Sequence, residues 1–102
     1  MNKIKINLDK TNLNAIIFVL MNFEPLNSAF KALLSICEEL CVKLEKKAIT
    51  ERKNTKNFNI SLKYYEAFAL ENILREFINQ KNSEHYIFNS ALIVANQINV
   101  QL

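Results

Sequence analysis

Residues 4 to 8, Ile4-Lys5-Ile6-Asn7-Leu8, alternate apolar and polar side chains with a period of two. This period places the apolar side chains on one face, which is typical of a half-buried β-strand. Residues 58 to 62 show the same alternation, Phe58-Asn59-Ile60-Ser61-Leu62. The sequence therefore predicts two short strands that belong to one small sheet. A third alternating segment, residues 98 to 102, fits either a last strand or the continuation of a helix, because Val94 and Ile98 also share a helical face.

Between these segments the apolar residues recur at the three- and four-residue steps of amphipathic helices. Asp9 is placed to cap a first helix over about residues 10–23, and Pro25 separates it from a second helix over about residues 27–49. A third helix is predicted over about residues 64–80, and Ser83 is placed to cap a fourth. The second helix carries a heptad seam of Leu26, Phe30, Leu33, Cys37, Leu40 and Leu44.

The predicted fold class is α+β, with four amphipathic helices and a sheet of two or three strands in the order β-α-α-β-α-α. An all-α four-helix bundle is the alternative, which applies if the alternating segments are extended arms. A chain of 102 residues has the size of one domain, so we expect residues 1–102 to form one.

An offset of 54 residues superimposes the apolar pattern of one half on the other, with Ile6 on Ile60, Leu20 on Leu74 and Leu40 on Val94. This spacing indicates an internal repeat of residues 1–49 and 58–102, joined by a basic loop at 50–57. Common binary patterning is the competing explanation.

Glycine is absent and Pro25 is the only proline, which argues against glycine-rich phosphate loops and Rossmann turns. We expect asparagine to take the left-handed backbone positions in turns, because it tolerates them better than most residues. The abundance of Asn, Ile and Lys is typical of a low-GC genome, so a bacterium, a phage or a mobile element is the expected source.

Residues with chemical potential are few. Cys37 and Cys41 lie one helical turn apart, but zinc requires four ligands, and His85 is the only histidine. We therefore expect both thiols to be core residues, and we predict no catalytic residues, metal, cofactor or small-molecule ligand, hence no enzyme. The carboxylates lie on predicted helix surfaces, where the spacing favours the salt bridges Glu39–Lys43 and Glu71–Arg75. Two cysteines so close together suggest no disulfide framework, and we expect a cytoplasmic protein without membrane contact.

Positive charge is concentrated in residues 46–63, which hold six basic residues and one acidic residue, whereas the whole chain carries a net charge of +3. Lysine and arginine can contact phosphates, and neighbouring tyrosines can stack on unpaired bases. The candidate nucleic-acid-binding residues are Lys46, Lys47, Arg52, Lys53, Lys56, Lys63, Tyr64 and Tyr65. A solvated loop is one alternative interpretation, and contact with an acidic protein surface is another.

The first predicted helix is apolar at every position from Ala15 to Met21. A helix that is apolar all round must be buried on nearly all sides. It is therefore either a central helix or one that faces a second copy or a protein partner. The candidate contact residues for such a homodimer or partner are Ile16, Ile17, Phe18 and Met21.

Two functional hypotheses follow. The first is a small non-enzymatic protein-interaction or regulatory module, an accessory or inhibitor protein of a bacterium, phage or mobile element. The second is a nucleic-acid-binding accessory protein that uses residues 46–63.

Overall fold

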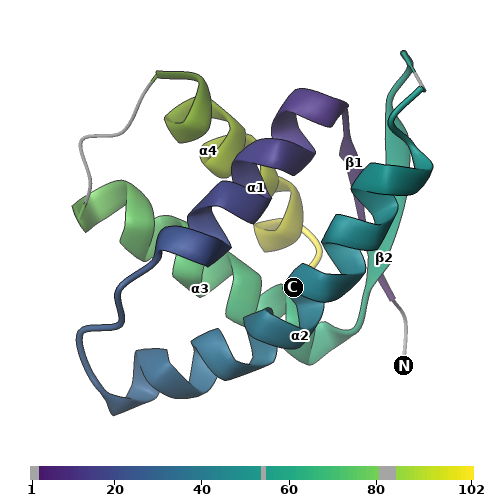
Figure 1. The fold of residues 1–102 in the computed structure, drawn as a ribbon. Coiled ribbons are helices and arrows are strands. Elements are labelled where there is room, and N and C mark those ends of the chain that lie inside the picture. Colours follow the sequence, from purple (N-terminus) through teal and green to yellow (C-terminus); the bar gives the residue numbers. More distant parts are fainter. Residues whose placement is uncertain (1–2, 54, 81–84) are drawn as a thin grey trace.

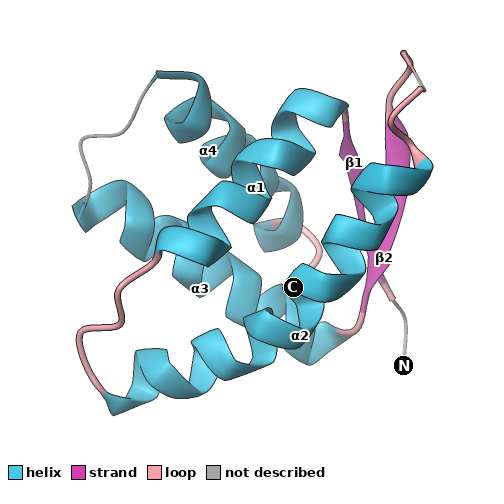
Figure 2. Ribbon diagram, in the orientation of Figure 1, coloured by secondary structure: helices cyan, strands magenta, loops and turns pink. Residues whose placement is uncertain are grey.

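The structure is a computed structural model that describes residues 3–53, 55–80 and 85–102. Its elements follow the order predicted from the sequence, so the α+β class is confirmed (Figures 1 and 2). The two strands lie side by side at one side of the molecule, and the helices fill the rest (Figure 2). The elements are β1 (Ile4–Leu8), α1 (Lys10–Asn22), α2 (Ser28–Thr50), β2 (Phe58–Leu62), α3 (Tyr64–Gln80) and α4 (His85–Asn99).

Side-chain caps fix the starts of the first two helices. Asp9 accepts a hydrogen bond from the Asn12 N–H at 2.8 Å, and Asn27 accepts one from the Phe30 N–H at 3.0 Å. Each cap satisfies a backbone donor that has no partner within its own helix. The predicted cap of the fourth helix, Ser83, lies outside the described residues.

The strands form a two-stranded antiparallel sheet, in which Ile6 stands opposite Ile60 and Leu8 opposite Phe58. The prediction from their alternation is confirmed, because the apolar side chains of both strands are buried and most of the polar ones are exposed. The all-α alternative is therefore wrong.

A third strand at residues 98–102 does not form. Ile98 and Asn99 end α4, and Val100 and Gln101 form a turn. The helical interpretation prevails because Val94 and Ile98 are both fully buried on the face that α4 presents to the core.

Helix α1 occupies the centre of the fold, where it packs on the other three helices and on β1. This central position buries most of the apolar side chains of α1. The heptad seam of α2 is buried only in its later part, at Cys37, Leu40 and Leu44. Near its start Phe30 packs against the Phe23 ring, and Leu26 is 69% exposed.

Burial recurs with the 54-residue spacing found in the sequence. The buried apolar side chains of α1 and the residue after it are Leu13, Ala15, Ile16, Val19, Leu20 and Phe23. Their counterparts 54 residues later are buried too, as Ala67, Ala69, Leu70, Ile73, Leu74 and Phe77. The sheet is consistent with this pattern, because its central pair, Ile6 and Ile60, joins equivalent positions. Descent from a duplication stays a prediction.

No described residue has a positive φ angle, so the expectation of left-handed asparagines is wrong for this part of the chain. Helix α2, for example, ends at Glu51 with φ −95° and ψ 9°. The asparagines act through their side chains instead. Asn27 caps α2, and Asn7 joins Asn57 and Asn59 through amide hydrogen bonds of 2.9 and 3.0 Å.

Candidate functional site

The outer edge of β1 is closed by two glutamines, Gln97 of α4 and Gln101 in the turn that follows it. Gln97 donates to the Asn7 carbonyl at 2.8 Å and accepts from the Asn7 N–H at 2.8 Å. Gln101 does the same at Lys5, with distances of 2.7 and 3.1 Å. A primary amide offers both a donor and an acceptor, so each glutamine replaces one residue of a neighbouring strand.

These bonds also define the outer edge of β2. Since Lys5 and Asn7 turn their backbone groups away from β2, the residues opposite them, Ser61 and Asn59, turn theirs away from β1. Lys43 Nζ donates to the Ser61 carbonyl at 2.8 Å. The N–H groups of Asn59 and Ser61 have no acceptor among the described residues, so the edge of β2 is open.

The difference between the two edges follows from one change of residue type. Lys43 and Lys47 of α2 stand 54 residues before Gln97 and Gln101 in the sequence, and Lys43 bonds β2 through the Ser61 carbonyl as Gln97 bonds β1 at Asn7. A lysine ammonium group has three donors and no acceptor. It can therefore bond the strand's carbonyls but can never accept from its N–H groups.

The two helices also differ in how closely they approach the sheet. Helix α4 packs directly on β1, whereas α2 packs on α1 and α3 and reaches β2 through its lysine side chains. The result is an open hollow of about 550 Å³ between α2 and β2, which we call the edge groove. It is lined by Lys3, Lys43, Lys46, Lys47, Thr50, Asn59, Ile60 and Ser61.

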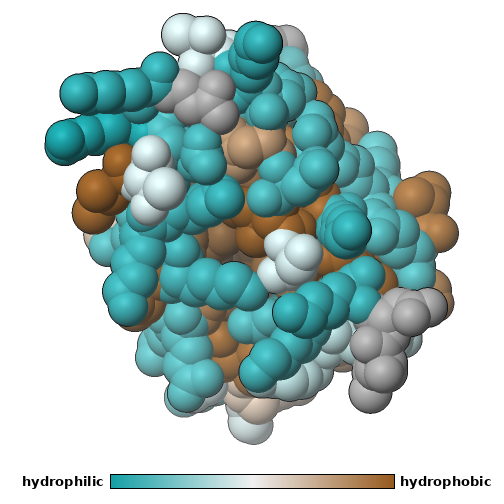
Figure 3. Space-filling view, turned by 90° about the vertical axis from the view of Figure 1, so that its right-hand side faces the viewer, coloured by the Kyte–Doolittle hydropathy of each residue, from teal (hydrophilic) through white to brown (hydrophobic). Residues whose placement is uncertain are grey.

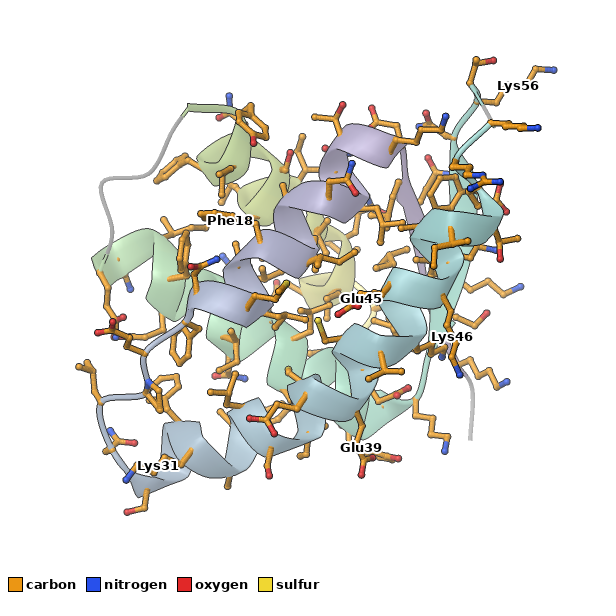
Figure 4. All side chains as sticks on the ribbon, in the orientation of Figure 1. Phe18, Lys31, Glu39, Glu45, Lys46 and Lys56 are labelled. Carbon is orange, nitrogen blue, oxygen red and sulfur yellow. The ribbon has the colours of Figure 1, made fainter. Side chains whose placement is uncertain are left out.

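The lining of the edge groove holds four cationic side chains and no carboxylate. Figure 3 looks onto the side of the molecule that holds β2 and the end of α2, where apolar surface shows between hydrophilic side chains. Figure 4 shows Lys46 on this side, far from Lys31 at the beginning of the same helix. The groove is therefore a cationic site whose edge-strand amides are additional donors.

Two of the four lysines are anchored and two are not. Lys43 lies 3.8 Å from Glu66 besides its bond to Ser61, so its predicted pairing with Glu39 is wrong. Lys47 pairs with Glu51 at 3.3 Å, and its ammonium group lies 5.7 Å from the centre of the Phe58 ring. The ammonium groups of Lys3 and Lys46 have no partner among the residues that the structure describes, which leaves both available to a ligand.

The structure distributes the predicted nucleic-acid-binding residues along β2. Lys46 and Lys47 line the edge groove. Arg52, Lys53 and Lys56 belong to the exposed loop before β2, with Lys56 near its tip (Figure 4). Beyond the other end of β2 come the exposed side chains of Lys63, Tyr64 and Tyr65, with the Lys63 ammonium 5.8 Å from the Tyr65 ring centre. A five-residue strand, about 17 Å long, separates these two outer groups.

The predicted interaction residues of α1 do not form one surface. Ile16 is 1% exposed and belongs to the core, and Ile17 is partly buried against it. Phe18 and Met21 are 44% and 69% exposed. Only these two present apolar surface to a partner.

Both cysteines are buried and free. Burial raises the pKa of the Cys37 thiol to about 12, and the charges of Cys41 and Glu66 add to the effect. Burial also raises the pKa of Cys41 to about 11, with the Glu45 carboxylate 3.5 Å from its sulfur. Within the described ranges, no three His, Cys, Asp or Glu residues lie close enough to hold a metal ion.

Sequence reasoning missed Lys3, Lys43, Asn59 and Ser61. One signal for Lys43 was present, because residues 43, 46 and 47 are three and four positions apart and must share a helix face. Lys3 continues the alternation of β1, which also indicates its face. The open edge could not be recognised, since it depends on which helix flanks each strand.

Among the described helices, none is long and apolar enough to cross a membrane. Comparison with protein-family models, with curated proteins and with solved structures found no match to this chain.

Proposed function

We propose that this protein is a non-enzymatic protein-interaction module that binds an acidic segment of a partner through the edge groove. The observation that carries the proposal is the lining of the groove, in which four lysines converge beside two backbone N–H groups that have no acceptor within the described part of the chain. Every one of these groups donates hydrogen bonds, and four of them are positively charged. The complementary ligand offers acceptors and negative charge.

The chemistry of the lining supports binding rather than catalysis. It consists of ammonium, amide, hydroxyl and backbone groups, together with Ile60. Two of the lysines are held by Glu51 and Glu66, so the groove is in part preorganised. Preorganised charges lower the cost of ordering side chains on binding.

Fluorescence anisotropy of a labelled six-residue peptide of alternating valine and glutamate tests the proposal. We expect the peptide to bind, and Lys46→Gln to weaken binding by up to about fivefold, the range of an exposed ion pair. The matched control is Lys31→Gln, which removes an exposed lysine from the other end of the same helix.

Peptides that carry glutamine or lysine in place of glutamate complete the test. We expect both to bind more weakly than the glutamate peptide, since the side chains of neither carry negative charge. Equal affinity for all three peptides, or equal losses in the Lys31 and Lys46 variants, would contradict the proposal.

Nucleic acid is a second candidate ligand, favoured by the exposed Arg52 and Lys53 in the loop next to the groove. Phosphate contacts would give binding that falls steeply between about 50 and 200 mM salt. Anisotropy of labelled single-stranded DNA, duplex DNA and RNA checks this. The double variant Arg52→Glu, Lys53→Glu should then weaken binding to all three and flatten the salt dependence, whereas no binding at low salt removes this candidate.

A further inference from the structure

We infer that the partner's acidic segment binds in extended conformation and pairs with β2 as a third strand, over residues Asn59 to Ser61. This inference rests on the proposed function and adds to it a binding mode. It states that the backbone of the partner makes the specific contacts and that its carboxylates add charge complementarity.

The open amides set the spacing that the ligand must match. Asn59 and Ser61 are two residues apart, so their N–H groups point the same way and lie about 6.6 to 6.8 Å apart along the strand. The carbonyl groups on one edge of an extended chain repeat at the same interval. An extended segment therefore meets both donors at once.

The bond from Lys43 to Ser61 does not block this edge. An incoming strand replaces the ammonium group at the Ser61 carbonyl with its own backbone N–H. The displaced ammonium group then lies beside the segment, where it can form an ion pair with a glutamate or aspartate side chain. Lys46, without a partner in the described structure, offers a second cation next to it.

The groove limits the length of the pairing. A hollow of about 550 Å³ lies within the range of sites that bind small ligands, roughly 300 to 1,000 Å³. Helix α2 stands alongside the hollow, so the added strand is short. Pairing with Asn59 and Ser61 requires only about three residues of the partner.

A second copy of this chain is a poor occupant for two reasons. If two β2 edges paired, the lysines that line one groove would face those of the other, and like charges across such a contact are unfavourable. The edge of β1 cannot serve either, because Gln97 and Gln101 already satisfy its outward groups. The charge of the groove therefore favours an acidic segment of another protein.

N-methylation of the peptide backbone tests the pairing directly. Two versions of the valine–glutamate peptide are prepared, one methylated at the valine amides and one at the glutamate amides. In a paired strand only alternate amides face β2, so one version should lose at least about tenfold in affinity and the other should bind like the parent peptide. An amide spectrum of the labelled protein should show hydrogen-exchange protection of Asn59 and Ser61 on binding.

A proline substitution provides a second test on the protein. Ser61→Pro removes an N–H that points away from β1, and proline is tolerated at such edge positions. We expect it to weaken peptide binding while the circular dichroism spectrum and the Lys46→Gln effect remain. The N-methylated peptides keep the inference testable if this variant does not fold.

The possible outcomes distinguish strand pairing from the proposed function. Binding of the parent peptide with equal affinity for both methylated versions overturns strand pairing and leaves the proposed function standing. No binding of the parent peptide overturns both. Binding of single-stranded DNA or of inorganic phosphate at the same amides, without binding of the peptide, would assign the groove to phosphate ligands and overturn the inference.

Discussion

Cys37 shows how burial, more than any neighbouring charge, determines the chemistry of a side chain in this fold. Its thiol is fully buried on α2, and removal from water raises its pKa from 9.0 to about 12. The thiolate is the reactive form of cysteine. Cys37 is therefore protected both by its burial and by its protonation. Burial also raises the pKa of its neighbour Cys41, to about 11, but Cys41 lies closer to the surface.

We predict that Cys37 resists thiol reagents in the folded protein. In a Cys41→Ser variant, reaction with a disulfide reagent at pH 8 should be at least tenfold slower in buffer than in denaturant. Reaction at the same rate under both conditions would contradict the buried position of Cys37.

The same pKa shift predicts that stability falls at alkaline pH. Above pH 9 the unfolded thiol loses its proton while the folded one keeps it up to about pH 12. The unfolded state then binds fewer protons, so the free energy of unfolding decreases as the pH rises through this window. Urea midpoints at pH 7.5 and 9.5 should show a smaller decrease for Cys37→Ala than for the wild-type chain. An equal decrease in both proteins would assign the effect to other groups.

Glu71 marks a limit of sequence reasoning at this scale. Its spacing from Arg75 predicted a salt bridge, and the pair is present at 3.1 Å. The spacing did not reveal that Glu71 is only 8% exposed, since an i,i+4 pair fits any face of a helix. Arg75 also donates to Asn96 of α4, a contact that depends on tertiary packing.

At the scale of elements, the two edges of the sheet are protected in different ways. Unpaired edges invite association with other chains, and proteins usually cover or charge them. Here Gln97 and Gln101 cover one edge, and the lysines of α2 charge the other.

We predict that the double variant Gln97→Ala, Gln101→Ala opens the edge of β1. It removes four hydrogen bonds to the backbone of Lys5 and Asn7, each worth about 0.5 to 1.5 kcal/mol. Thermal unfolding should show a loss of about 2 kcal/mol or more, and light scattering should show association that increases with concentration. The matched control is Asn99→Ala, at an exposed residue between the two glutamines, which should change neither measurement. A variant as stable and monodisperse as the control would show that the glutamines are dispensable.

For the whole molecule, the sequence predicted most of the architecture and little of the candidate site. Helix and strand positions follow from periodicity, which is a local property, and α3 begins and ends where the sequence placed it. The site combines residues of β1, α2 and β2, and its character depends on the unequal distances of α2 and α4 from the sheet. Those distances are set by packing and cannot be read from any single segment.

We predict that the two halves fold only together. Each strand pairs with the strand of the other half, α1 packs on α4, and α2 packs on α3, so each half buries its apolar faces against the other. Fragments 1–53 and 54–102 should each be largely unfolded by circular dichroism, and an equimolar mixture should regain helical signal. A fragment that is fully helical and unfolds cooperatively alone would contradict this prediction.

The closed edge of β1 also determines valency. A sheet with two open edges can accept a strand on each side and can therefore propagate into a fibre. In the described part of the chain this sheet has one open edge, so a segment that pairs with β2 meets the closed edge of β1 on the other side of the sheet. If a segment pairs with β2, we therefore expect the sheet to stop growing there, with one bound segment for each chain.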